Sequence, residues 1–339
     1  MRESIRKRLP VAIQSLVSVA LLALLFRSLD LAALRQLYAT MPLWFYLLSL
    51  AVILGGQVLY AWRWRQVLAA SGVPVTIGTA IRQYFIGVFL NNFFPSTVGG
   101  DMAKVYYLGR HHGYRPIAAS IVLDRLLSIG LLAVLATTMY WVAPDPSPQF
   151  VATRAFVTII AACLLGGLVL AARGTGGLPR RLAPFGTFAV RLAERAQRFR
   201  HDMATAARQP HIVFQSAAVV TTYFFALTGI YRLFLSLDTG AHPAFLTLMT
   251  AVTTASLLSN IPISINGLGL REQLHAILLA PLGVTREAAV AISLLTFAHL
   301  LVSSLLGVLF WLQLPAAIKS QLPTSEAEIP LDSEIPVDS

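Results

Sequence analysis

Long apolar stretches recur along the whole chain and set its organisation. A bilayer core of about 30 Å is crossed by roughly 20 apolar residues in an α-helix. Six stretches reach about this length, at approximately 10–27, 43–61, 118–142, 152–172, 212–236 and 288–314. The last is long enough to tilt within the bilayer. The pattern predicts an all-α fold, a polytopic membrane helix bundle with six full spans.

Two further apolar regions, 78–112 and 243–282, are each broken by polar residues, proline and glycine. The first break reads NNFFPSTVGGD over 91–101, and the second reads SNIPISINGLGLRE over 259–272. Proline removes a backbone donor and glycine loosens the chain, so each region is expected to form two half-helices joined by irregular chain. Irregular backbone is tolerated at membrane depth only where protein or water satisfies it. We therefore expect two re-entrant hairpins that face a polar interior.

Basic residues predict the orientation, because positively charged segments stay on the cytoplasmic side. Four of them precede the first span, at Arg2, Arg6, Lys7 and Arg8. If the first broken region is re-entrant, the next cytoplasmic segment adds Arg63, Arg65, Arg82, Lys104, Arg110 and Arg115. The arginine-rich connection 173–211 falls on the same side, whereas 143–150 and 237–243 contain no Lys or Arg. Both termini are therefore expected in the cytoplasm.

This orientation makes the two hairpins enter the membrane from opposite sides. The chain then divides into candidate inverted repeats, 10–142 and 152–314. Each break contains an asparagine, a proline and a serine, followed by two glycines and a carboxylate. Paired discontinuous segments of opposite orientation are typical of transporters with a binding site near the membrane midplane.

Composition supports a single membrane domain over residues 1–315. The chain of 339 residues is 56% hydrophobic and 12% charged, with a mean hydropathy of +0.70, which excludes a single water-soluble domain. The formal net charge of +11 suits nucleic acid or anionic lipid, and the apolar excess favours lipid. A basic amphipathic pattern over 184–207 would lie on the inner leaflet or simply enforce topology. The acidic tail 316–339 is expected to be disordered.

Candidate binding groups gather at the first break. Its glycines would let backbone N–H groups approach a ligand closely, and the half-helix that follows would direct its positive end toward an anion. Lys104, three residues after Asp101, would add a cation on the same helical face. The alternative is that Asp101 only caps the helix. The candidate substrate-binding residues of this segment are Asn91, Asn92, Ser96, Gly99, Gly100, Asp101 and Lys104.

Two adjacent charged residues, Asp124 and Arg125, interrupt the third full span and join the candidate site. Neighbouring positions on a helix point about 100° apart, so these two are not expected to pair with each other. Arg125 could reach a phosphate or Asp101, and Asp124 could meet Arg82 or Arg271. The alternative is an ordinary buried ionic network that fixes helix packing.

The second break offers similar chemistry. A guanidinium binds phosphate through paired donors, and a neighbouring carboxylate could orient it or bind a cationic group. Helix capping with a buried Arg–Glu pair would explain the same residues. The candidates here are Asn260, Ser264, Asn266, Gly267, Gly269, Arg271 and Glu272. Neither a metal nor a cofactor is expected, because the histidines lack a cluster of ligating neighbours and no nucleotide-binding motif is present.

Three stretches resemble the lysylphosphatidylglycerol synthase membrane-domain family, whose members are also called flippase-like. They are NNFFPSTVGGDMAKVYYLGR at 91–110, ASIVLDR at 119–125 and NIPISINGLGLREQ at 260–273, and with the span pattern the resemblance covers about 8–315. It implies an integral protein of a bacterial inner membrane that handles polar lipids. In bifunctional members this domain is thought to translocate an aminoacylated phospholipid made by a separate cytosolic domain. No such transferase domain is expected here, because only 24 residues, 316–339, follow the last span.

The leading hypothesis is a lipid flippase or lipid-handling transporter that moves a polar or anionic head group between leaflets. Without a nucleotide motif, movement would be downhill or coupled to an ion gradient. One alternative is a membrane-embedded lipid or glycolipid transferase with Asp101 or Asp124 as general base. Another is a non-catalytic subunit of glycolipid or hopanoid biosynthesis. The expected partners are membrane lipids and lipid-biosynthesis enzymes, and nucleic acid is not among them.

Overall fold

The computed structural model describes residues 19–93, 99–143, 148–173, 209–238 and 242–313, except 22, 26, 28 and 262. Within these ranges the regular structure is helical and contains no strand, so the expected all-α class is confirmed. The helices run in the order α2 (Leu31–Thr40), α3 (Leu43–Ala70), α4 (Ile77–Phe93), α5 (Gly99–His112), α6 (Tyr114–Val142), α7 (Pro148–Arg173), α10 (Pro210–Asp238), α11 (Phe245–Ser259), α12 (Leu270–Leu279), α13 (Arg286–Ser304) and α14 (Leu306–Leu312). Two 3-10 turns, η2 (Ile265–Gly267) and η3 (Ala280–Leu282), flank α12.

Four helical segments are long and apolar enough to cross a membrane. They are α3, α6, α10 and the nearly continuous pair α13 and α14, which together cover Arg286–Leu312. The predicted stretch 152–172 lies within α7, and the described part of 10–27 is helical. The chain is therefore a polytopic helical membrane protein, while six complete crossings stay a prediction. Ser96, the segment 184–207 and the tail 316–339 lie outside the described residues.

Helix α3 continues well past the end of its predicted apolar stretch, 43–61. It ends at Ala70, just before Gly72, whose φ of 81° is readily adopted by glycine. Arg63 and Trp64 therefore lie inside the helix, and each is only 1% exposed. Lys104, which was counted on the same cytoplasmic side, is likewise buried at 8% exposure, and the membrane side of both residues stays a prediction. The predicted orientation rests on the remaining basic residues.

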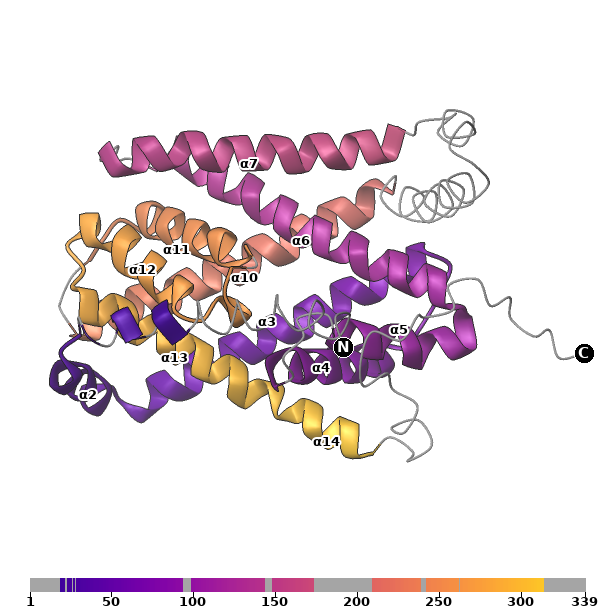
Figure 1. The fold of residues 1–339 in the computed structure, drawn as a ribbon, viewed down its shortest axis with the longest axis horizontal. Helices are drawn as coiled ribbons and strands as arrows, with labels where there is room; N and C mark the ends of the chain where they lie inside the picture. The colour runs from indigo at the N-terminus through magenta and orange to yellow at the C-terminus, as the bar shows by residue number, and fades with distance from the viewer. Residues whose placement is uncertain are drawn as a thin grey trace, which may run out of the picture.

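The two broken regions each form a pair of helices that pack against one another. Helix α4 packs against α5, and α11 packs against α12. Figure 1 shows the two pairs on opposite sides of the centre along the long axis, with α11 and α12 to the left and α4 and α5 to the right. Their breaks meet, because Asn266 Nδ2 donates a hydrogen bond of 2.6 Å to Asn92 Oδ1. The two broken regions thus meet at one point, while the inverted repeats 10–142 and 152–314 stay a prediction.

Small residues bring α4 and α5 together. A Cβ atom on Gly100 would overlap the backbone carbonyl of Gly87. Backbones in such close contact leave no room for a side chain, so glycine is required at the start of α5. A similar contact joins α14 to α4, where a Cβ on Gly307 would overlap the carbonyl of Phe85. Helix α4 is therefore packed closely against both α5 and α14.

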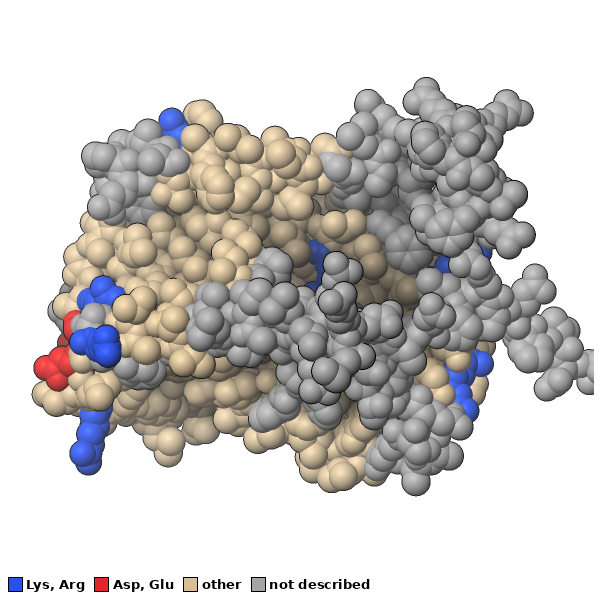
Figure 2. Space-filling model, viewed as in Figure 1, with Lys and Arg blue, Asp and Glu red and all other residues tan. Residues whose placement is uncertain are grey.

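The main apolar core lies between α3, α6, α10, α11 and α13, and it includes the fully buried Phe45, Phe234 and Leu248. Large apolar side chains also cover the outside, as in Phe214 and Leu309, which are 76% and 56% exposed. In Figure 2 the described part of this face is mainly uncharged, with blue and red atoms toward the left end and blue atoms toward the right end. An apolar belt with charged ends is what a lipid environment requires.

Candidate functional site

A cavity of about 290 Å³ lies where α3, α4, α5 and α6 meet, with α10 and α11 completing its wall. Six of the residues proposed from the sequence line it: Asn91, Asp101, Lys104, Asp124, Arg125 and Asn260. The lining residues that sequence reasoning missed include Tyr60, Arg63, Trp64, Tyr84 and Ser128. In Figure 2 blue atoms are visible in a recess near the middle of the face, away from the charged ends.

Asp101 is the centre of one ion cluster in this cavity. It lies in the first turn of α5, with Lys104 Nζ 3.1 Å from its Oδ1. Arg125 reaches the other carboxylate oxygen from α6, and its Nε donates a hydrogen bond of 2.6 Å to Oδ2. The structure thus contains the pairing of Arg125 with Asp101 that the sequence suggested. It also keeps a carboxylate near the N-terminus of α5, where the helix dipole favours negative charge.

Aromatic rings enclose the ammonium group of Lys104. Its Nζ lies 5.2 Å from the ring centroid of Trp64 and 5.1 Å from that of Tyr84. A cation over an aromatic face is stabilised by the ring quadrupole, and this contribution grows when water is excluded. Lys104 is therefore fixed in the wall by two rings and by Asp101.

Asp124 forms a second ion pair with Arg63. Arg63 Nη2 lies 2.8 Å from Asp124 Oδ1, and Arg63 Nε donates to the same oxygen at 3.0 Å. The proposal that Asp124 meets Arg82 or Arg271 is therefore corrected. The continuation of α3 through Arg63 is the reason, since it places that guanidinium against α6, within reach of Asp124 and Ser128.

Two buried donors in the wall have no hydrogen-bond partner among the residues that the structure describes. They are Arg63 Nη1 and Trp64 Nε1. Buried polar groups are nearly always hydrogen-bonded, so a donor left without a partner beside a cavity suits a ligand or an ordered water there. The charged residues of the lining are three cations, Arg63, Lys104 and Arg125, and two carboxylates, Asp101 and Asp124. The described wall therefore carries one excess positive charge.

The irregular chain next to the cavity is held by asparagine side chains. Asn91 Oδ1 accepts a hydrogen bond of 2.8 Å from the backbone N–H of Gly100, which ties α4 to the first turn of α5. Across the centre, Asn266 has φ 54° and Gly267 has φ 74°. Asparagine and glycine tolerate this left-handed conformation better than other residues do. The local chain can therefore bend to bring Asn266 to Asn92.

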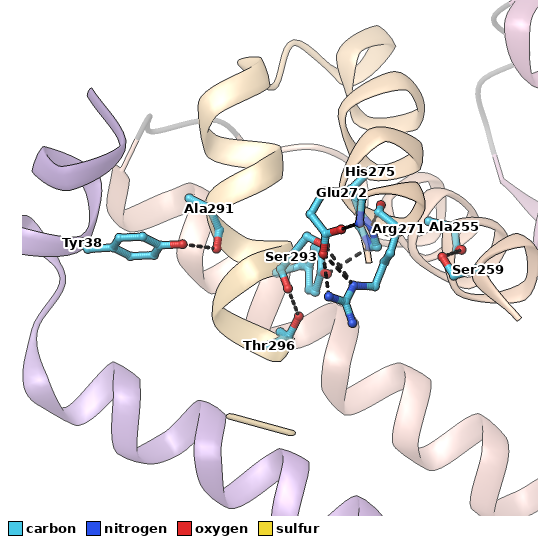
Figure 3. A network of polar contacts seen from close by, with 11 residues as sticks. Tyr38, Ala255, Ser259, Arg271, Glu272, His275, Ala291, Ser293 and Thr296 are labelled. Carbon is cyan, nitrogen blue, oxygen red and sulfur yellow. Dashed lines mark hydrogen bonds and ion pairs between the residues drawn. The ribbon is translucent and has the colours of Figure 1, made fainter. Parts of the chain in front are cut away.

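Arg271 and Glu272 form a separate cluster in the second pair of helices (Figure 3). Glu272 is fully buried, and its Oε2 accepts a hydrogen bond of 2.7 Å from the N–H of Gly269. Its Oε1 lies 2.5 Å from Arg271 Nη2, and the Arg271 guanidinium lies 4.5 Å from the ring centroid of Phe297. This geometry matches the alternative interpretation, a helix cap with a buried Arg–Glu pair. Neither residue is among those that line the cavity.

The remaining residues of the second break have distinct places. Asn260 is exposed but still lines the cavity. Ser264 is 4% exposed, and its hydroxyl has no hydrogen-bond partner among the described residues. Gly269 has φ 79° and precedes α12. Polar groups of both breaks thus converge on the centre, whereas the charged residues of the cavity come from the first half of the chain.

Comparison with known proteins identifies the family. A family model described as the lysylphosphatidylglycerol synthase TM region matches residues 11–307. The chain belongs to this family. The match to the lysylphosphatidylglycerol synthase TM region spans both pairs of half-helices and all the residues that line the cavity. The resemblance stated from the sequence is therefore confirmed.

One curated relative of this family member is a UPF0104 membrane protein of Pyrococcus horikoshii. The two are 29% identical over 89 residues, which is 25% of this chain and 27% of the relative. The matched part thus spans about a quarter of the relative's length. No solved structure matches the chain.

Proposed function

We propose that this protein carries a polar lipid head group between the leaflets of a membrane, through the cavity beside Asp101 and Asp124. The acyl chains would remain in the bilayer while the head group passes the two breaks. One observation carries the proposal. Five charged side chains line a cavity inside an apolar helical protein, and Asn91 in its wall is next to Asn92, through which the two broken regions meet. Charged residues at such depth are costly and usually mark a path for a polar substrate.

Transport fits this geometry better than group transfer. A general base needs a carboxylate within reach of the reacting group and able to take up its proton. Asp101 is held by Lys104 and Arg125, and Asp124 by Arg63. Both carboxylates therefore already neutralise cations in the wall, and they suit a path for a head group better than a catalytic centre.

The proposal also covers the membrane in which the protein lies, its orientation and its partners. A basic N-terminal segment and the arginines of 173–211 favour cytoplasmic termini in a bacterial inner membrane. Membrane lipids would be the direct partners, and enzymes of lipid biosynthesis could supply the cargo. Movement would be downhill or coupled to an ion gradient, because the sequence contains no nucleotide-binding motif.

Reconstitution tests the proposal. The full chain is inserted into liposomes that contain fluorescent lipids, and the accessibility of the label to an added quencher is followed over time. We expect protein-dependent exchange between leaflets and no new lipid by mass spectrometry. Asp101→Asn should slow this exchange at least tenfold, whereas Arg286→Gln, at an exposed position away from the cavity, should not.

Three other outcomes would contradict the proposed transport function. A new lipid product would assign the protein to the transferase class. Neither movement nor product, with correct insertion shown by protease accessibility, would favour a non-catalytic subunit. Equal rates for Asp101→Asn and the unmodified chain would show that head groups do not pass this cavity.

A further inference from the structure

The charges of the cavity restrict the head group that it can hold, and this inference rests on the proposed function. We infer that the site selects a lipid with a net-anionic phosphodiester head group and discriminates against one that carries an additional amine. The substrate class would then be phosphatidylglycerol-like rather than the aminoacylated lipid of the family name.

The first support is the balance of charge. Three cations and two carboxylates line the cavity, so a phosphodiester with one negative charge would neutralise the described wall. A lysyl ester of the same lipid carries two ammonium groups beside its phosphate and is net positive. Placing it beside an excess positive charge is unfavourable, because like charges repel strongly where water is scarce.

The second support is a pair of donors ready for an anion. Arg63 and Trp64 line the cavity, and their Nη1 and Nε1 atoms are buried and lack a partner among the described residues. Both can donate only, and neither can accept a hydrogen bond from an ammonium group. Phosphate oxygens are strong acceptors and match the donors of a guanidinium. A bound phosphodiester would therefore satisfy groups that the protein leaves open.

The third support is that the groups able to hold a cation are already in use. The rings of Trp64 and Tyr84 face Lys104, and the ring of Tyr60 lies 4.8 Å from the Arg63 guanidinium. Each carboxylate also pairs with a cation of the wall. An ammonium or choline head group would have to share a carboxylate with one of these internal cations, whereas a phosphate would not.

Direct binding tests this selectivity without relying on transport. Calorimetry on the full chain in detergent would compare three lipids with the same six-carbon acyl chains: phosphatidylglycerol, phosphatidylcholine and lysylphosphatidylglycerol. We expect phosphatidylglycerol to bind at least tenfold more tightly than the other two. Glycerophosphoglycerol, the head group without acyl chains, should bind much more weakly, because it lacks the apolar part of a lipid.

A conservative pair of variants assigns the effect to the cavity. Trp64→Phe keeps a ring beside Lys104 but removes the open N–H donor, so phosphatidylglycerol should bind about tenfold more weakly, as expected for a hydrogen bond to a charged acceptor. Trp44→Phe is the matched control, since Trp44 is 50% exposed on the same helix. The affinity of the Trp44→Phe variant for phosphatidylglycerol should equal that of the unmodified chain.

The results separate the selectivity from the proposed function. Equal affinity for the lysyl lipid or for phosphatidylcholine, or no effect of Trp64→Phe, would overturn the selectivity even if the liposomes show transport. Equal affinity for glycerophosphoglycerol would identify a soluble phosphodiester as the ligand and overturn the assignment to a lipid. Selective binding without leaflet exchange would leave the site intact and overturn transport alone.

Discussion

Removing one member of the buried pair formed by Arg63 and Asp124 should strongly destabilise the protein. The two side chains are 2% and 14% exposed, and Nη2 and Oδ1 are 2.8 Å apart. At this distance, with an effective dielectric constant of about 20, the attraction is about 6 kcal/mol before desolvation is subtracted. Breaking a buried pair by removing one partner typically costs about 3–5 kcal/mol, because the other charge remains buried and uncompensated.

We therefore expect Arg63→Gln and Asp124→Asn each to lower the free energy of unfolding by roughly 3–5 kcal/mol. The loss in the double variant should be smaller than the sum of the two single losses by roughly 2–3 kcal/mol, because no charge is left alone. Reversible unfolding of the purified protein in mixed micelles, with increasing sodium dodecyl sulfate, would measure all three. Additive losses within about 0.5 kcal/mol would show that the pair is not coupled and would refute this account of the wall.

Three further variants test other parts of the structure. Gly100→Ala should destabilise the protein by about 1–3 kcal/mol despite the better helix propensity of alanine, because its Cβ would meet the carbonyl of Gly87; thermal unfolding measures this. Asn266→Ala should remove the hydrogen bond to Asn92 and cost about 1 kcal/mol, which an unchanged melting temperature would contradict. Glu272→Gln should cost about 3 kcal/mol in micelle unfolding yet leave phosphatidylglycerol affinity unchanged, since the carboxylate lies outside the cavity.

The helical membrane fold could be predicted because its signals are local. Apolar stretches of the required length mark the long helices, and proline, asparagine and glycine mark the two breaks. Asp101, Asp124 and Arg125 were also identifiable, because charges within apolar stretches need a special environment. The structure places all three at one cavity.

Arg63 and Trp64 were missed because the end of a helix was confused with the end of its apolar stretch. The true stop is Gly72, with Pro74 shortly after it, and these residues give a recognisable signal for a helix end. The pairing of α3 with α6 could not be predicted in this way. It depends on helix rotation and on contacts between residues about sixty positions apart, which no local pattern specifies.

Arg271 and Glu272 illustrate the opposite limit. Their position after two glycines resembles that of Asp101 after Gly99 and Gly100, and the sequence suggested equal roles for the two breaks. In the structure Glu272 turns back to cap its own helix and holds Arg271. Similar motifs can therefore serve either a cavity or a helix end, and the choice depends on neighbouring helices that lie far away in the sequence.

The amide contact between Asn92 and Asn266 has a mechanical consequence. It joins segments 174 positions apart with one bond between neutral groups, while stronger ion pairs secure the helices nearby. A polar molecule that both donates and accepts hydrogen bonds could replace this bond at little net energy. This contact can thus exchange its internal partner for an external one while the ion pairs nearby stay in place.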